Sequence, residues 1–209
     1  MLFVHNTSRV ADEPYPNLLR EMGFGGFPSL AFLDAEGEKR AVPNARDVAV
    51  FESTLHALGV VDALSAKAER SAEEDAELFA ARLDLGAIPF AEARPLAEKH
   101  LKSLPAARAV EVENELRLLE MADVLRRAGK ERTKAFADFA AMAKADRAPT
   151  GPRSSTFWIG VMSFALEQKD AELLERGIHA METEFATRPG LDAMLARFRD
   201  GLAELKKKD

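Results

Sequence analysis

The sequence predicts an α+β protein, with a small strand-containing unit over residues 1–59 and an all-helical domain over residues 60–209. Two observations lead to this expectation. Short apolar segments bounded by turn residues, as in strands, occur only before Gly59. From Val60 onward, apolar residues recur at the spacing of amphipathic helices. The composition, 47% hydrophobic and 31% charged, is typical of a soluble globular protein with buried cores.

Residues 1–59 carry alternating strand and helix signals. Gly23 stands where a helix would end, since glycine readily adopts the left-handed conformation of a C-cap. Asp34-Ala35-Glu36-Gly37 has the composition of a hairpin turn, and Gly59 is expected to end the last helix. The expected order is strand, helix, strand, strand, helix, over residues 3–4, 15–22, 30–33, 39–42 and 47–58.

A glycine-proline segment, Met22 to Ser29, leads into the apolar run Leu30-Ala31-Phe32-Leu33. Glycines allow close backbone approach, and a proline at a strand entry removes a donor and can hold a cis bond. This arrangement resembles the cis-proline loop of the thioredoxin superfamily. The resemblance implies a loop that binds an extended peptide or thiol ligand, with Gly26, Phe27, Pro28 and Ser29 as the binding residues.

The chain departs from the thioredoxin pattern because it has no cysteine. The family's first strand and Cys-x-x-Cys helix would lie before Met1, which leaves the expected sheet without its central strand. An upstream start, a strand from a second chain, or movement of the strand at residues 3–4 would each fill that position. The leading hypothesis is a non-catalytic binding or scaffold protein for a protein or peptide partner, with self-association through the unfilled position. The alternative is a fragment of a thiol-disulfide oxidoreductase.

A weaker alternative is a glutathione transferase-like protein, because that family also joins a thioredoxin-like domain to an all-helical one. The family's Glu/Asp-Ser pair begins a helix and holds the γ-glutamyl group of glutathione. Here Glu52-Ser53 lies inside the expected helix over residues 47–58. The match is therefore poorer than that of the Pro28 loop.

The region after Val60 is expected to form helical hairpins arranged as a short solenoid or a bundle. Residues 81–101, with Leu85-Gly86 and Phe90-Ala91-Glu92-Ala93, weakly resemble a tetratricopeptide repeat. Pro95 either kinks the second helix of this pair or marks a later start. The expected helices cover residues 71–86, a segment from about Pro89, and residues 107–128, 136–143, 157–164, 174–185 and 191–205.

Composition narrows the classes of function. A formal net charge of −6 disfavours a nucleic-acid partner, and no apolar run approaches the roughly 20 residues of a membrane span. The N-terminus lacks the pattern of a secretory signal, so a cytoplasmic location is expected. No catalytic arrangement and no cofactor motif is evident. No metal site is predicted, because the four histidines are scattered and none has another at the i, i+3 or i, i+4 spacing of metal ligands on a helix. They are His5, His56, His100 and His179.

Overall fold

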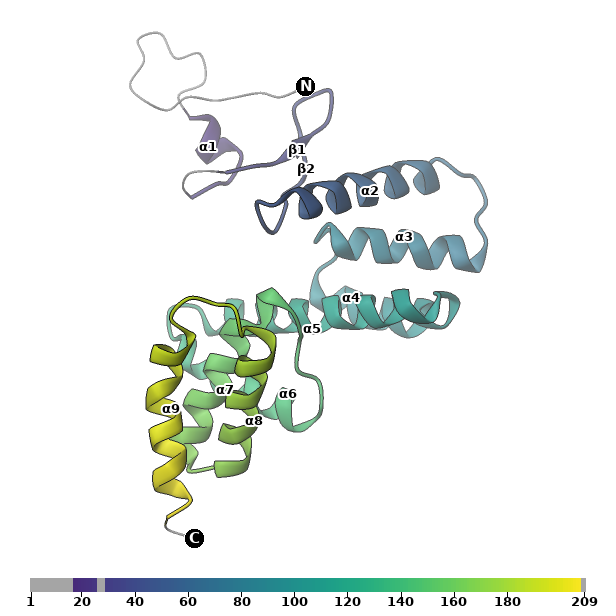
Figure 1. The fold of residues 1–209 in the computed structure, drawn as a ribbon. Helices are drawn as coiled ribbons and strands as arrows, with labels where there is room; N and C mark the ends of the chain where they lie inside the picture. Colours follow the sequence, from purple (N-terminus) through teal and green to yellow (C-terminus); the bar gives the residue numbers. More distant parts are fainter. Residues whose placement is uncertain (1–16, 26–28, 208–209) are drawn as a thin grey trace, which may run out of the picture.

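The computed structural model describes residues 17–25 and 29–207 and is built mainly of helices. A single-turn helix, α1 (Leu18–Glu21), precedes two short strands, β1 (Phe32–Leu33) and β2 (Lys39–Ala41). In Figure 1, α2, α3 and α4 lie in successive layers, and α6 to α9 gather into a bundle beyond them. The longer helices are α2 (Val48–Ser65), α3 (Ala72–Asp84), α4 (Phe90–His100), α5 (Ala106–Ala128), α6 (Ala135–Lys144), α7 (Ser155–Gln168), α8 (Ala171–Glu184) and α9 (Leu191–Leu205).

The two strands form a small antiparallel hairpin. Phe32 lies opposite Ala41, and the register shifts between Phe32 and Leu33. The turn is held by Asp34, whose Oδ1 accepts hydrogen bonds from the backbone N–H groups of Glu36 and Glu38 at 3.1 and 2.8 Å. Within the described residues, the strands pair only with each other.

The expected α+β class, with its thioredoxin-like strand and helix unit, is therefore wrong. The sequence predicted a buried strand over residues 30–33, but Leu30 and Leu33 are 38% and 43% exposed. An apolar segment becomes a core strand only when other strands or helices cover its faces, and this hairpin buries only Ala41. The strand expected at residues 3–4 lies outside the described residues.

The expected end of a helix at Gly59 is also wrong, since α2 continues to Ser65. The helical spacing of apolar residues continues after the glycine with Val60, Val61 and Leu64. The helix therefore stays continuous through Gly59 and packs along α3. A glycine inside a helix costs only about 1 kcal/mol, which such packing offsets. The boundary expected between residues 59 and 60 consequently falls inside α2.

The later helices agree closely with their expected positions. The Ser71 side chain accepts a hydrogen bond from the Glu74 N–H, and the Glu74 carboxylate accepts one from the Ser71 N–H. This capping box begins α3 at Ala72, as the sequence indicated. Helix α4 begins at Phe90 and contains Pro95, so the later start considered for this helix is excluded.

Two hydrophobic clusters form the interior, and α5 contributes to both. Val112 and Leu116 belong to a smaller cluster with α3 and α4, whereas Leu118, Met121 and Val124 belong to a larger one with α6 to α9. The long helix α5 therefore connects a thin layered region to a denser bundle. The fully buried large side chains of the bundle are Phe139, Phe157, Phe198, Met142, Met162, Leu174, Met181, Leu195 and Val161.

The break at Pro149-Thr150-Gly151-Pro152 is held in place by side chains of α5 and α8. The amide group of Asn114 donates to the Thr150 carbonyl and accepts from the Thr150 N–H, at 3.3 and 2.8 Å. The Glu184 carboxylate accepts from the Gly151 N–H and from the buried Ser154 hydroxyl, at 3.0 and 2.9 Å. These bonds make the loop a rigid connection between α6 and α7.

Candidate functional site

The loop residues predicted from the sequence fall largely outside the described part of the chain. Gly26, Phe27 and Pro28 are not described, while Ser29 is half-buried just before β1. Ligand binding by this loop stays a prediction. The Ser53 hydroxyl of the glutathione transferase alternative donates to the Val50 carbonyl within α2, at 3.0 Å.

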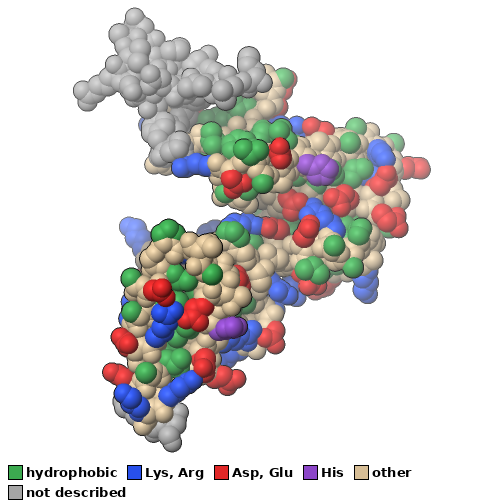
Figure 2. All heavy atoms as spheres, viewed as in Figure 1, with side chains coloured by type: hydrophobic (Ala, Val, Ile, Leu, Met, Phe, Trp, Pro, Cys, Tyr) green, Lys and Arg blue, Asp and Glu red, His purple; other side chains and the backbone are tan. Residues whose placement is uncertain are grey.

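A groove of about 570 Å³ lies where α2, the first turns of α3 and the start of α5 meet. Its volume is within the range of roughly 300–1,000 Å³ that is usual for ligand sites. Figure 2, in the same orientation as Figure 1, shows acidic side chains on the surface over the region of α2 and α3. The residues lining the groove are Val60, Ala63, Leu64, Glu73, Glu74, Glu77, Ser103, Leu104 and Pro105.

The floor of the groove is formed by apolar residues of α2, on a side of the helix that α3 covers only in part. Val60 and Leu64, one helical turn apart, are half-buried, and Ala63 between them is exposed. Leu104 is buried at the edge, and the exposed Pro105 immediately precedes α5. Among the described residues, helix α2 packs chiefly against α3, and the stripe of Val60, Ala63 and Leu64 keeps part of its surface exposed.

The wall opposite the floor carries three glutamates of α3, Glu73, Glu74 and Glu77. Hydrogen bonds from its own backbone N–H and from Ser71 lower the pKa of Glu73. The Lys67 ammonium, followed by the backbone of Ser71, lowers the pKa of Glu74. Glu73 and Glu74 are therefore charged at neutral pH.

Arg108 lies behind this wall and forms ion pairs with acidic residues. Its guanidinium bonds Asp84 at 2.5 Å and Glu111 at 3.0 Å, and lies 3.6 Å from Glu77. Burial raises the pKa of Asp84, and the hydrogen bond from Arg108 opposes that shift. Arg108 thus ties α3 to α5 without lining the groove.

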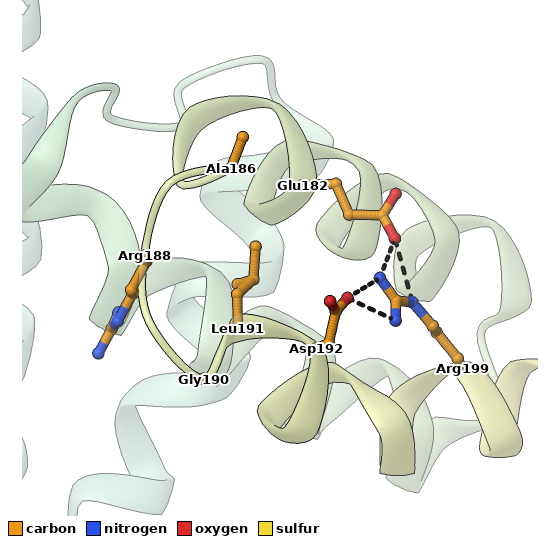
Figure 3. A pocket seen from close by; sticks show the side chains of 7 residues that line it. All are labelled: Glu182, Ala186, Arg188, Gly190, Leu191, Asp192 and Arg199. Atoms are coloured by element: carbon orange, nitrogen blue, oxygen red, sulfur yellow. Dashed lines mark hydrogen bonds and ion pairs between the residues drawn. The ribbon is translucent and has the colours of Figure 1, made fainter.

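A second, smaller pocket of about 300 Å³ lies between the end of α8 and the start of α9 (Figure 3). Arg199 spans it, with its guanidinium 2.7 Å from Glu182 and 3.1 Å from Asp192. Figure 3 shows Arg188 pointing away from these three residues. Both carboxylates of this pocket are therefore paired with Arg199.

Within residues 17–25 and 29–207, no group of three or more His, Asp or Glu side chains is placed to hold a metal ion. His100 is buried and stacks on Phe79, with ring centroids 5.6 Å apart. His56 and His179 are exposed on separate helices, and His5 is not described. None of the described histidines contributes to either pocket.

Helix α2 is the one helix in the described part of the chain that is long and apolar enough to cross a membrane by composition, and 11% of it is buried. One helix of this kind is weak evidence for a span. It carries Glu52 and Asp62, and the Asp62 carboxylate forms two hydrogen bonds with Arg40 at 3.0 and 2.6 Å. These features do not make the chain a clear membrane protein.

Comparisons with known proteins found no family model, no curated protein and no solved structure that matches this chain. The resemblances to the thioredoxin superfamily and to tetratricopeptide repeats therefore stay predictions. The groove itself was not predicted, because Leu104 at its edge lies 40 residues after Leu64 in the sequence. The continuation of the apolar stripe through Val60 and Leu64 was the available signal, and it was obscured by Gly59.

Proposed function

We propose that this protein is a non-catalytic binding or scaffold protein, which holds a protein or peptide partner in the groove between α2 and α3. The observation that carries the proposal is the apolar floor of that groove, formed by Val60, Ala63 and Leu64 of a helix that, among the described residues, packs chiefly on α3. Uncovered apolar surface next to polar residues is typical of interaction sites. We also expect the protein to act in the cytoplasm.

The layered helices support this proposal. Helical hairpins stacked in succession present extended surfaces to partners, because each layer contacts mainly its neighbours. Helix α2 lies at one end of the stack and packs chiefly on α3. Binding in this position requires no cofactor and no metal.

The test is selection from a peptide library on the full-length protein, followed by binding measurements with a blocked variant. Ala63→Gln places a larger neutral side chain on the exposed floor while keeping a good helix former. We expect the selected peptides to bind this variant about tenfold more weakly. Ala49→Gln is the matched control, since Ala49 is exposed on α2 outside the groove.

Two results would contradict the proposal. Selection on the wild-type protein could enrich no peptide sequence, or the enriched peptides could bind Ala63→Gln as tightly as Ala49→Gln. Light scattering on the same samples identifies a second copy of the chain as the occupant. If the wild-type protein is a dimer and Ala63→Gln dissociates it, the groove binds a second copy of the chain and not a foreign partner.

A further inference from the structure

We infer that the partner held in this groove is a basic amphipathic segment, with apolar side chains on the floor and Lys or Arg facing Glu73 and Glu77. The inference rests on the proposed function and names the chemical class of its partner. It follows from the groove's shape together with the charges on its wall.

The floor suits the apolar face of a helix. Val60 and Leu64 are separated by one helical turn, and Leu104 extends the apolar surface toward α5. Amphipathic helices bind such grooves through apolar residues at the same periodicity. Since a cavity of about 150 Å³ already holds a benzene molecule, a groove of about 570 Å³ has room for roughly three apolar side chains.

Among the described residues, the lining contains three glutamates and no Lys or Arg. Glu73 and Glu77 are four residues apart, and like charges at this spacing destabilise a helix. Glu73 forms no ion pair among the described residues, and Glu77 is reached only by Arg108, at 3.6 Å. A cation from a ligand would therefore relieve repulsion that the protein itself leaves in place.

Glu74 on the wall and Arg108 behind it already have oppositely charged partners. Glu74 pairs with Lys67 and completes the capping box with Ser71. The guanidinium of Arg108 makes its closer contacts with Asp84 and Glu111. An acidic segment in this groove would meet carboxylates without an available cation, so the charge pattern selects against it.

The probes for the test are three synthetic peptides of about 14 residues, or four helical turns. Each presents leucines at the same helical positions, and the other positions are lysine in one peptide, glutamine in the second and glutamate in the third. Binding to the full-length protein is measured by fluorescence anisotropy at low and at physiological ionic strength. We expect the lysine peptide to bind most tightly and the glutamate peptide most weakly, with the difference shrinking as salt screens the charges.

Matched variants test whether Glu73 causes the preference. Glu73→Gln should weaken binding of the lysine peptide by about threefold to tenfold and leave the glutamine peptide unaffected. Glu172→Gln is the control, because Glu172 is also an exposed second residue of a helix, and it is not in either pocket. This control variant should bind all three peptides like the wild-type protein.

The outcomes separate the inference from the proposed function. If the glutamine or glutamate peptide binds as tightly as the lysine peptide and Ala63→Gln weakens them all, the groove binds segments without selecting basic ones, and the inference fails alone. If Glu73→Gln and Glu172→Gln weaken the lysine peptide equally, its binding reflects overall charge, and the inference again fails. If no peptide binds and library selection also enriches none, the proposed function fails with it.

Discussion

Helices α2 and α7 are both strongly apolar, yet the structure buries them to very different extents. Helix α7 packs against α6, α8 and α9, and its buried residues include Phe157, Val161 and Met162. Helix α2 packs chiefly against α3 and buries only Ala57 and Leu58. The apolar content of a helix therefore determines how much surface needs cover, whereas its neighbours determine how much is covered. The uncovered surface of α2 is the basis of the proposed function.

The largest difference between the two helices is expected from truncating an apolar side chain in each. Phe157→Ala in α7 removes a fully buried ring and should lower the free energy of unfolding by about 3–5 kcal/mol. Leu55→Ala in α2 removes a side chain that is 55% exposed and should change it by no more than about 0.5 kcal/mol. Urea denaturation of both variants measures the effects. A loss above about 2 kcal/mol for Leu55→Ala would mean that α2 is covered in solution.

Glycine substitutions sharpen the same comparison and should have opposite signs. A Cβ at Gly160 of α7 would lie 2.8 Å from ring atoms of both Phe136 and Phe139, so Gly160→Ala should destabilise the fold by about 1–3 kcal/mol. A Cβ at Gly59 of α2 meets nothing within 4 Å, so Gly59→Ala should stabilise it by about 0.5–1 kcal/mol. Thermal denaturation followed by circular dichroism measures both. The comparison breaks if the two substitutions shift the melting temperature in the same direction.

The helix caps of the two regions give a smaller contrast. Asp170, before α8, accepts from the Leu173 N–H at 3.0 Å and pairs with Lys144 at 2.7 Å. Asp47, before α2, accepts from the Val50 N–H at 2.9 Å. Each cap should contribute about 0.5–2 kcal/mol, with Asp170→Ala costing more than Asp47→Ala because it also removes an ion pair.

The pH dependence of the Asp170 contribution has a defined sign. The hydrogen bond from Lys144, followed by that from Leu173, lowers the pKa of Asp170 below its ordinary value of 3.8. The stabilisation is therefore complete above pH 3.8 and is lost as the pH falls through the lowered pKa. Denaturation of the wild type and Asp170→Ala at pH 7 and pH 2.5 checks this. An undiminished difference at the lower pH would contradict it.

Local signals predicted the helices after residue 70 well. The capping box at Ser71 fixed the start of α3, and the break at Pro149-Thr150-Gly151-Pro152 lies between α6 and α7 as expected. Both features involve residues that are adjacent in the sequence, where propensity and capping chemistry act. Regular helices could therefore be located without knowledge of the fold.

The strands and the groove depend on contacts that the sequence does not display. Leu30 and Leu33 have the composition of a buried strand, but burial requires covering elements from elsewhere in the chain. The groove needs Leu104 and Pro105 beside Leu64, which are brought together only by the packing of α2, α3 and α5. The apolar floor could be suspected from the stripe on α2, whereas its acidic wall required the three-dimensional structure.

The smallest expected effect on stability comes from His100, which is buried beside the smaller hydrophobic cluster of α3, α4 and α5. His100 stacks on Phe79, and burial, followed by the charge of Lys99, lowers its pKa from 6.5, while Asp75 opposes the shift. The unfolded chain then binds more protons than the folded one, so the free energy of unfolding should fall as the pH drops below about 6.5 and level off below the lowered pKa.

Replacing the imidazole isolates this contribution. His100→Phe keeps an aromatic ring on Phe79 and removes the titrating group, so its stability should vary less than that of the wild type between pH 7 and pH 5. Urea denaturation across that range gives both slopes. Identical slopes would show that protonation of His100 does not affect the layered region. If the free energy of unfolding of the variant varies less with pH, protonation of the buried His100 weakens the layered region. The bundle, whose interior is apolar, would not respond to pH in this way.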